Sequence, residues 1–285
     1  MFNDLKLWLL GLLSASLNGF DAMRISAEKV LKSGLGAWDS VASLSNYLRP
    51  FCYTIVAICL LIEVVQVFMK SDIMKWETGL KICIKMVLAK VCIDVAPTFL
   101  KACYAQAQEW ITQLASGGSV LGSEALSYIA PLVHDVNGFG VLGMFLATSV
   151  LFLAIQICGL MILVIAYGRM FELYVYLAVS PLPCAFLPLG DVGGGFANSI
   201  TSKFFKSFAA VCLQGVMMVI VLHVFDLTLD RAISELMAEA AMNTISLGKV
   251  AAITDLIFTM LLGSIALVMA IFKSGNWAKS ILNAM

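Results

Sequence analysis

Charged residues are scarce in this 285-residue sequence, in which Asp, Glu, Lys and Arg together make up 13%. Soluble domains are about one-quarter charged and about half apolar. Here 61% of the residues are hydrophobic and the mean hydropathy is +0.96, which excludes an ordinary soluble domain and indicates a polytopic membrane protein. The 18 basic and 18 acidic residues cancel, so the chain also lacks the basic surplus of a standing nucleic-acid-binding protein.

Few residues suit catalysis or metal binding. The two histidines, His134 and His223, lack a second ligand at metal-binding spacing. The eight cysteines form no Cys-x-x-Cys pair and mostly lie within apolar runs, so we expect small buried side chains rather than metal ligands or disulfides. The glycine-rich turn at residues 190–195 lacks the pattern of a phosphate-binding loop. No nucleophile–base set or carboxylate pair is evident, and we expect neither an enzyme nor a cofactor.

Long apolar runs predict the membrane spans. A helix needs about 20 apolar residues to cross a hydrocarbon core about 30 Å thick. The first two runs form a tight hairpin over residues 50–100, and the last three form a core over residues 139–272. The fold class predicted is all-α, a polytopic helical membrane protein with five transmembrane helices at residues 51–69, 80–100, 139–167, 204–225 and 250–272.

The remaining segments are more polar. Residues 1–49 alternate apolar stretches with charges and contain no run of span length, which predicts two amphipathic helices at the membrane surface or packed on the spans. Residues 101–138 predict a polar extramembrane connection, and residues 273–285 an amphipathic cytoplasmic tail. After the fourth span, acidic residues recur at helical spacing and are expected to form a solvated face: Asp226, Asp230, Glu235 and Glu239.

Prolines are few, but three of the six fall in YGRMFELYVYLAVSPLPCAFLPLG, residues 167–190. A helix from Arg169 to Val179 would cover about 16 Å, roughly half a hydrocarbon core. Pro181 biases Ser180 away from the α region, and Pro181 and Pro183 each remove a backbone donor. Broken backbone persists at membrane depth only where protein buries it or where it faces water. We therefore predict a re-entrant half-helix over residues 168–190 rather than a sixth span.

The distribution of Lys and Arg gives an expected orientation. Five spans with the N-terminus outside place eight basic residues on the cytoplasmic side and five outside, counted near the span ends. Six spans with the N-terminus inside divide them seven to six. The count favours five spans, with the N-terminus outside and the C-terminus in the cytoplasm.

The second span carries four charged residues: Lys81, Lys85, Lys90 and Asp94. Each charge near a span centre costs roughly 2.5–3.5 kcal/mol on insertion scales. Lys81 lies near the interface and is expected to extend its amine toward water. Lys90 and Asp94 have the i, i+4 spacing of an ion pair. Two roles remain open for Lys85, Lys90 and Asp94, namely structural pairing or lining of a polar channel.

Two further ion pairs are predicted from spacing. Because the hairpin turns near Met74, the numbers of facing residues should add up to about 148, which places Glu63 beside Lys85. Arg169 and Glu172 lie three residues apart at the start of the predicted half-helix and are expected to pair locally.

Three stretches in order, YGRMFELYVYLAVSPLPCAF, SKFFKSFAAVCLQGVMMVIV and IFKSGNWAKSILNAM, resemble the TrbL family, inner-membrane components of conjugative type IV secretion systems, in its Gram-positive conjugative-element version. The likeness covers roughly residues 139–285, with a looser one in the hairpin, and the turn DVGGGFANS departs from it. The residues that carry it are Tyr167, Gly168, Arg169, Met170, Glu172, Pro181, Pro183, Gln214, Gly215, Phe272, Lys273, Gly275, Ala278, Lys279 and Ser280.

The resemblance implies a channel or scaffold component that helps single-stranded DNA with its attached relaxase cross the cytoplasmic (inner) membrane. Five spans are too few to enclose a DNA conduit alone, and no ATP-binding motif is present. Implied partners are therefore copies of the chain, other secretion components, a secretion ATPase and the lipid bilayer. The alternatives are a small-solute transporter or ion channel, and an assembly platform without DNA contact. The channel or functional candidates are Arg169, Glu172, Pro181, Pro183, Lys85, Lys90, Asp94, Glu63 and Gln214.

Overall fold

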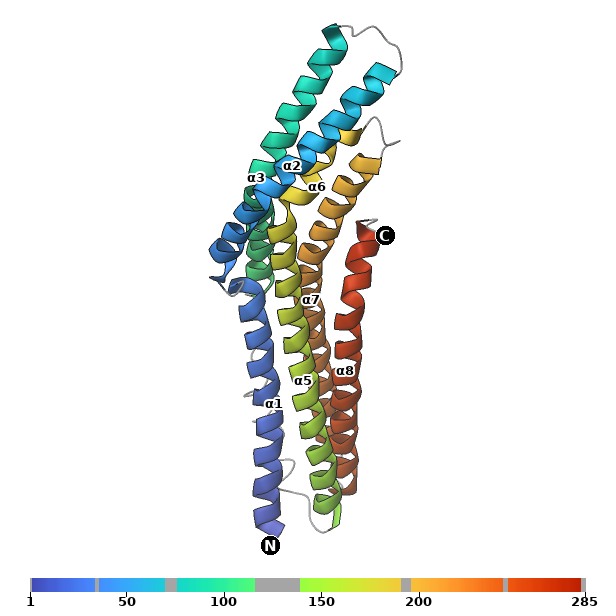
Figure 1. The fold of residues 1–285 in the computed structure, drawn as a ribbon. Coiled ribbons are helices and arrows are strands. Elements are labelled where there is room, and N and C mark those ends of the chain that lie inside the picture. Colours follow the sequence, from blue (N-terminus) through green and yellow to red (C-terminus); the bar gives the residue numbers. More distant parts are fainter. Residues whose placement is uncertain are drawn as a thin grey trace. The chain divides into compact units, whose positions relative to one another are not determined.

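The computed structural model describes residues 2–33, 36–69, 76–115, 139–190, 196–242 and 246–282, and every regular element in these ranges is helical. The all-α prediction is confirmed for this part of the chain (Figure 1). The elements are α1 (Phe2–Ser33), α2 (Trp38–Met69), α3 (Trp76–Ala115), α5 (Phe139–Val179), α6 (Pro181–Ala185), the 3-10 helix η2 (Leu187–Gly190), α7 (Phe196–Met242) and α8 (Ser246–Ile281).

Four segments of the described helices are long and apolar enough to cross a membrane: Trp38–Met69, Val141–Ala185, Ile200–Glu235 and Ile253–Ile281. They overlap four of the five predicted spans. The predicted second span lies within α3, whose three lysines and one aspartate at positions 81, 85, 90 and 94 keep it out of this set. The chain is thus a multi-pass membrane protein, with four such segments among the residues that the structure describes.

Most helices are longer than the apolar runs within them. The helix before the first span was expected to end at Arg49 and Pro50, yet α2 continues through Pro50. A proline at this position removes one helical hydrogen bond and crowds the Asn46 carbonyl, a local cost that the helix tolerates here. Helix α3 extends past Leu100 to Ala115, so the first part of the predicted polar connection is helical. The rest of that connection, residues 116–138 with His134, lies outside the described residues.

Helix α5 runs unbroken for 41 residues, about 60 Å, from Phe139 to Val179. The Arg169–Val179 segment therefore continues the third span instead of starting a separate helix. The helix ends where the prolines predict. The expected departure of Ser180 from the α region is wrong, because Ser180 has φ −53° and ψ −32° and its hydroxyl donates to the Leu177 carbonyl over 2.8 Å.

The chain forms two compact units, and each is described separately. Unit 1 consists of residues Met1–Lys32, Ile111–Tyr167 and Val216–Ser274. Unit 2 consists of residues Ser33–Trp110, Gly168–Gly215 and Gly275–Met285.

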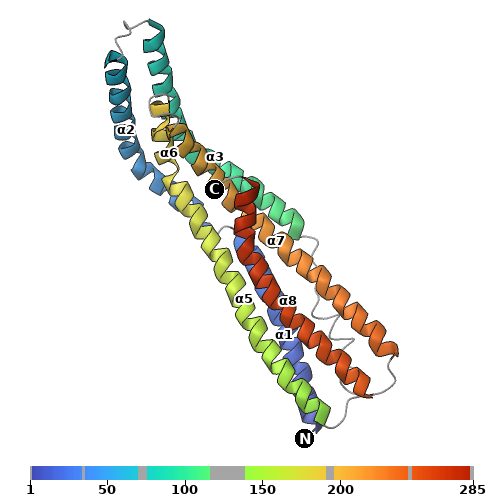
Figure 2. The same ribbon diagram turned by 90° about the vertical axis from the view of Figure 1, so that its right-hand side faces the viewer.

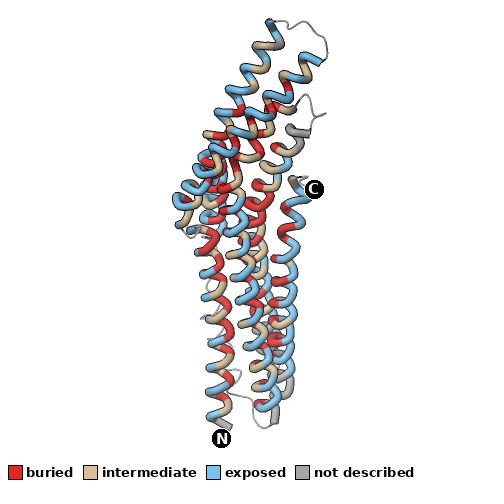
Figure 3. Tube along the Cα trace, in the orientation of Figure 1, coloured by how far each residue is buried: buried red, intermediate tan, exposed pale blue. Residues whose placement is uncertain are grey.

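Within unit 1, α1 packs as a full member of a helix bundle with segments of α5, α7 and α8 (Figures 1 and 2). Leu9, Leu13, Leu17 and Phe20 recur at spacings of four and three residues and are buried, which gives α1 one apolar stripe. Figure 3 shows such buried positions recurring along the helix. Of the two placements that the sequence allowed for this helix, the structure shows packing on other helices.

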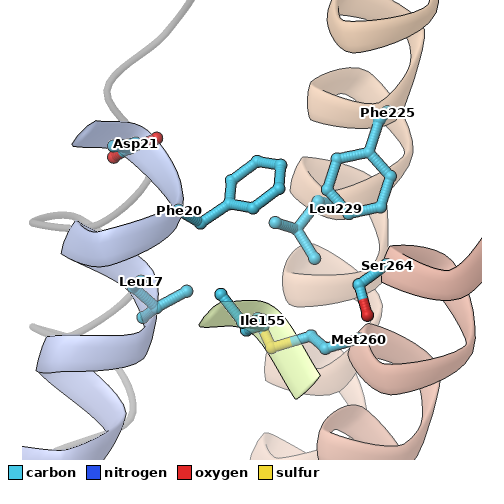
Figure 4. A pocket seen from close by; sticks show the side chains of 8 residues that line it. All are labelled: Leu17, Phe20, Asp21, Ile155, Phe225, Leu229, Met260 and Ser264. Carbon is cyan, nitrogen blue, oxygen red and sulfur yellow. The ribbon is translucent and has the colours of Figure 1, made fainter. Parts of the chain in front are cut away.

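A small, mostly apolar cavity lies where these four helices meet (Figure 4). The Phe20 ring of α1 lies 5.2 Å from the Phe225 ring of α7, measured between centroids. Helix α8 contributes Met260 and Ser264 to the lining, and α5 contributes Ile155. The cavity lining thus shows that α1 belongs to the core of unit 1.

A buried ion pair joins α1 to α7 in unit 1. The Arg24 Nη1 atom donates to Asp226 Oδ2, and the two side chains are 6% and 4% exposed. The expectation that Asp226 belongs to a solvated face is wrong, because α1 covers that side of α7. Asp230 and Glu235 are exposed, as expected, and the side chain of Glu239 lies outside the described residues.

Replacement of either partner of this pair is expected to destabilise the protein. Arg24→Met leaves the buried Asp226 carboxylate without its guanidinium, and Asp226→Leu leaves Arg24 with the longer 3.6 Å contact to Glu28. Breaking a buried pair costs about 3–5 kcal/mol, with the larger loss expected for Arg24→Met, whereas the double variant removes both charges and should recover most of the loss. Thermal denaturation of the purified protein in detergent measures this. Lys29→Met, an exposed position on α1, is the control. Wild-type stability of either single variant would contradict a structural role for the pair.

Candidate functional site

All nine candidate residues lie in unit 2, although they come from five separate helices of the sequence. Glu63 belongs to α2, and Lys85, Lys90 and Asp94 belong to α3. Arg169 and Glu172 belong to α5, Pro181 and Pro183 to α6, and Gln214 to α7. Unit 2 therefore gathers the whole predicted site.

The proline-rich break is buried against the α2–α3 hairpin (Figure 1). In α6, Pro181, Pro183, Cys184 and Ala185 are all buried. Cys184 and Ala185 form one apolar cluster with residues of the hairpin: Cys52 and Val56 of α2, and Ala89, Ile93 and Ala96 of α3. The break thus meets one of the two conditions under which irregular backbone is stable at membrane depth, burial in protein.

Hydrogen bonds from neighbouring groups satisfy the backbone at the break. The Phe186 amide donates to the Pro183 carbonyl over 3.4 Å. The Thr201 hydroxyl, from α7, donates to the same carbonyl over 2.8 Å and is buried. Thr201 therefore ties α7 to the break, a role that no sequence signal indicated.

The predicted Glu63–Lys85 ion pair is confirmed. Lys85 Nζ lies 2.6 Å from Glu63 Oε1, with the Glu63 side chain 5% exposed and that of Lys85 26% exposed. Because this short contact joins α2 to α3, it fixes the register of the hairpin at the position that the numbering rule gave.

The predicted Lys90–Asp94 pair is wrong, because Asp94 pairs with α2 instead. Tyr53 Oη donates to Asp94 Oδ1 over 2.7 Å, and Arg49 Nη1 lies 3.9 Å from the same oxygen. The numbers of Tyr53 and Asp94 add up to 147, so the hairpin rule would have found this contact. Within the described part of the chain, no carboxylate lies within ion-pairing distance of Lys90.

The predicted Arg169–Glu172 pair is confirmed, with Arg169 Nη1 2.5 Å from Glu172 Oε2. Its position differs from the expectation. Because α5 is continuous, the pair lies within the helix about 16 Å before Ser180, and not at the mouth of a separate half-helix.

An aromatic cluster beside this pair was not predicted. The Trp38 ring lies 4.4 Å from the ring of Tyr104 and 5.2 Å from that of Tyr174, between centroids. The Tyr104 hydroxyl contacts Met170 Sδ at 3.3 Å. Met170 and Tyr174 lie one turn apart on α5, and this i, i+4 spacing was the only signal in the sequence. The cluster holds α5 to α2 and α3 next to Arg169.

Gln214 and Gly275, which come from two separate motifs, meet in unit 2. Gln214 is 2% exposed. A Cβ atom at position 275 would lie 2.8 Å from Gln214 Nε2 and 3.0 Å from Oε1, so a larger residue there would require the buried amide to shift. The contact gives a packing reason for both residues.

Metal-binding and cysteine chemistry add no further site in the described residues. No group of three or more His, Cys, Asp or Glu side chains gathers there as metal ligands would. All eight cysteines are free, but Cys83 and Cys103 are exposed on α3, contrary to the expectation of burial. The glycine-rich turn at residues 191–195 lies outside the described ranges.

Neutralising Glu63 is expected to lower the amount of inserted protein several-fold, because Lys85 loses the Glu63 carboxylate at a depth where a charge costs about 2.5–3.5 kcal/mol. Glu63→Gln, Lys85→Met and the double variant are compared by quantifying the protein in isolated membranes. The double variant should partly restore insertion. Lys81→Met, exposed on the same helix, is the control. A double variant no better than either single one would disprove the coupling.

Gly275→Leu is expected to destabilise the protein by about 1–3 kcal/mol, because the new side chain overlaps the buried Gln214 amide. Gly168→Leu, where an added Cβ meets no atom within 4 Å, should have little effect. Thermal denaturation in detergent compares the two variants. Adding Gln214→Ala to Gly275→Leu makes room and should recover stability. Equal losses at positions 168 and 275 would contradict the contact.

Comparison with known protein families identifies the chain. Residues 34–181 match the family described as TrbL/VirB6 plasmid conjugal transfer like protein. No curated protein and no solved structure matches the chain. The match includes α2, α3 and α5 and ends at Pro181, so the expected likeness of the later motifs, with Gln214 and Gly275, lies outside it. Since the match covers just over half of the residues, this chain belongs to the TrbL/VirB6 plasmid conjugal transfer family.

Proposed function

We propose that this membrane component of conjugal transfer acts in the cytoplasmic membrane as a channel or scaffold subunit, and helps single-stranded DNA with its relaxase to cross. The family match over residues 34–181 is the observation that carries the proposal. The match contains the hairpin, its Glu63–Lys85 pair and the Arg169–Glu172 pair.

Further physical features support a role within a larger assembly. The described chain offers four membrane-capable segments, and α3 would be a fifth span that its ion pairs make tolerable. Five spans are too few to surround a DNA strand, so several copies or other secretion subunits must complete a conduit. A secretion ATPase supplies the energy, because the sequence has no phosphate-binding loop.

For the orientation of the spans, we propose the arrangement that the basic residues favour. The turn between α2 and α3 and the C-terminus then lie in the cytoplasm, and the residues before α2 lie outside. A re-entrant half-helix over residues 168–190 is not part of this arrangement, because α5 continues unbroken to Val179.

Deletion of the gene is expected to abolish DNA transfer by the conjugative element that carries it. Wild-type protein should restore transfer, whereas Arg169→Ala should be made at normal levels and remain inactive, because Glu172 loses its partner beside the aromatic cluster. Conjugation frequency is the measurement. Phe171→Ala, an exposed neighbour on α5, is the control and should be active. Unchanged transfer after deletion would contradict the proposal and favour small-solute transport.

A further inference from the structure

The exposed surface of α3 is divided into two faces of different chemistry. Around the helix axis, Cys83, Asp94 and Lys101 lie within about 40° of Lys90. Six exposed apolar side chains lie about 60–180° away from Lys90: Ile84, Val87, Leu88, Val91, Val95 and Phe99. Met86, also exposed, lies about 40° from Lys90 and is the apolar residue within the first face. We call the first set, with its α2 partners Arg49, Tyr53 and Asp39, the polar face of the hairpin.

Contacts between the two helices continue the polar face along the hairpin. Asp94 binds Tyr53 and Arg49. Further along, Lys101 Nζ lies 2.8 Å from Asp39 Oδ1, in a pair whose side chains are both well exposed. The polar face therefore extends from the middle of the predicted second span to the end of the hairpin away from its turn.

Lys90 is the unneutralised charge of this face. It is exposed and lines a groove with Tyr53, Val56, Leu60 and Met86. Within the described ranges it has no carboxylate partner, whereas Lys85 on the other flank of α3 is paired with Glu63. The face therefore carries one net positive charge, from three basic and two acidic side chains: Arg49, Lys90, Lys101, Asp39 and Asp94.

A lysine ammonium in the middle of a span is stable only if it faces water or a charged partner, since hydrocarbon provides neither. The apolar face of the same helix can face lipid, so α3 has one side suited to each environment. We propose that the polar face of the hairpin lines the water-filled transfer path, where Lys90 attracts the phosphates of the passing DNA strand. This inference rests on the proposed function and on α3 crossing the membrane.

A single positive charge, which binds phosphate weakly, suits a surface along which a DNA strand moves. Each neutralised phosphate adds to affinity through release of counterions, so a strongly basic lining would retain the strand. On this face, Asp94 and Asp39 offset Arg49 and Lys101, and Lys90 alone is left to guide the strand.

The reactivity of introduced cysteines tests whether the polar face is in contact with water or with lipid. Lys90→Cys and Leu88→Cys are placed separately in a chain whose eight native cysteines are replaced and whose transfer activity is retained. The two positions lie at the same depth, two residues apart and on opposite faces of α3. A charged methanethiosulfonate reagent reacts with the thiolate, which forms in water and not in hydrocarbon. We expect the Lys90→Cys variant to react about ten-fold faster or more than Leu88→Cys, whereas equal, slow reaction of both variants would overturn the inference.

A photocrosslinking residue at position 90 then identifies what passes this face. In cells that are transferring DNA, we expect an adduct with the transferred strand at position 90 and none at position 88. Adducts with protein alone would overturn the inference and assign the face to an acidic partner subunit. Loss of transfer on gene deletion is scored separately, so a wrong face and a wrong function give different results. A reactive Lys90→Cys variant together with unchanged transfer after gene deletion would mean a water path for another solute.

Discussion

The burial of the α5–α6 break is the constraint on which unit 2 depends. Pro181 and Pro183 cannot donate backbone hydrogen bonds, and an apolar segment with open backbone groups is unstable in a membrane unless protein covers it. The α2–α3 hairpin covers α6 through Cys184 and Ala185, and Thr201 binds the Pro183 carbonyl. Hairpin, break and the start of α7 must therefore form together.

Charged side chains add specificity to this apolar packing. The Glu63–Lys85 pair joins α2 to α3, and the Arg24–Asp226 pair joins α1 to α7. In each pair the two residues belong to different helices, so the charges meet in one register of the helices only. If one helix slipped along the other, a buried charge would move away from its partner. Lys90 differs from these residues, because no carboxylate in the described part of the chain pairs with it. The free energy of placing its ammonium group in the membrane therefore depends on what surrounds the hairpin.

Membership of the TrbL/VirB6 family gives these features a functional setting. The matched residues, 34–181, end at the first proline of the break, and they include both helices that cover it. The α2–α3 hairpin thus packs against the break and also carries the residues of the polar face. A subunit built in this way can present a fixed polar surface to a transfer path while its other face meets lipid.

The sequence by itself determined the helical membrane class, the family, the end of α5 and the two ion pairs Glu63–Lys85 and Arg169–Glu172, because composition, proline chemistry and short-range spacing are local properties. Only the tertiary structure decided the partner of Asp226, the place of Thr201 and the contact between Gln214 and Gly275. Those contacts join helices that are distant in the chain. Their geometry follows from how the helices pack, and no local pattern contains that information.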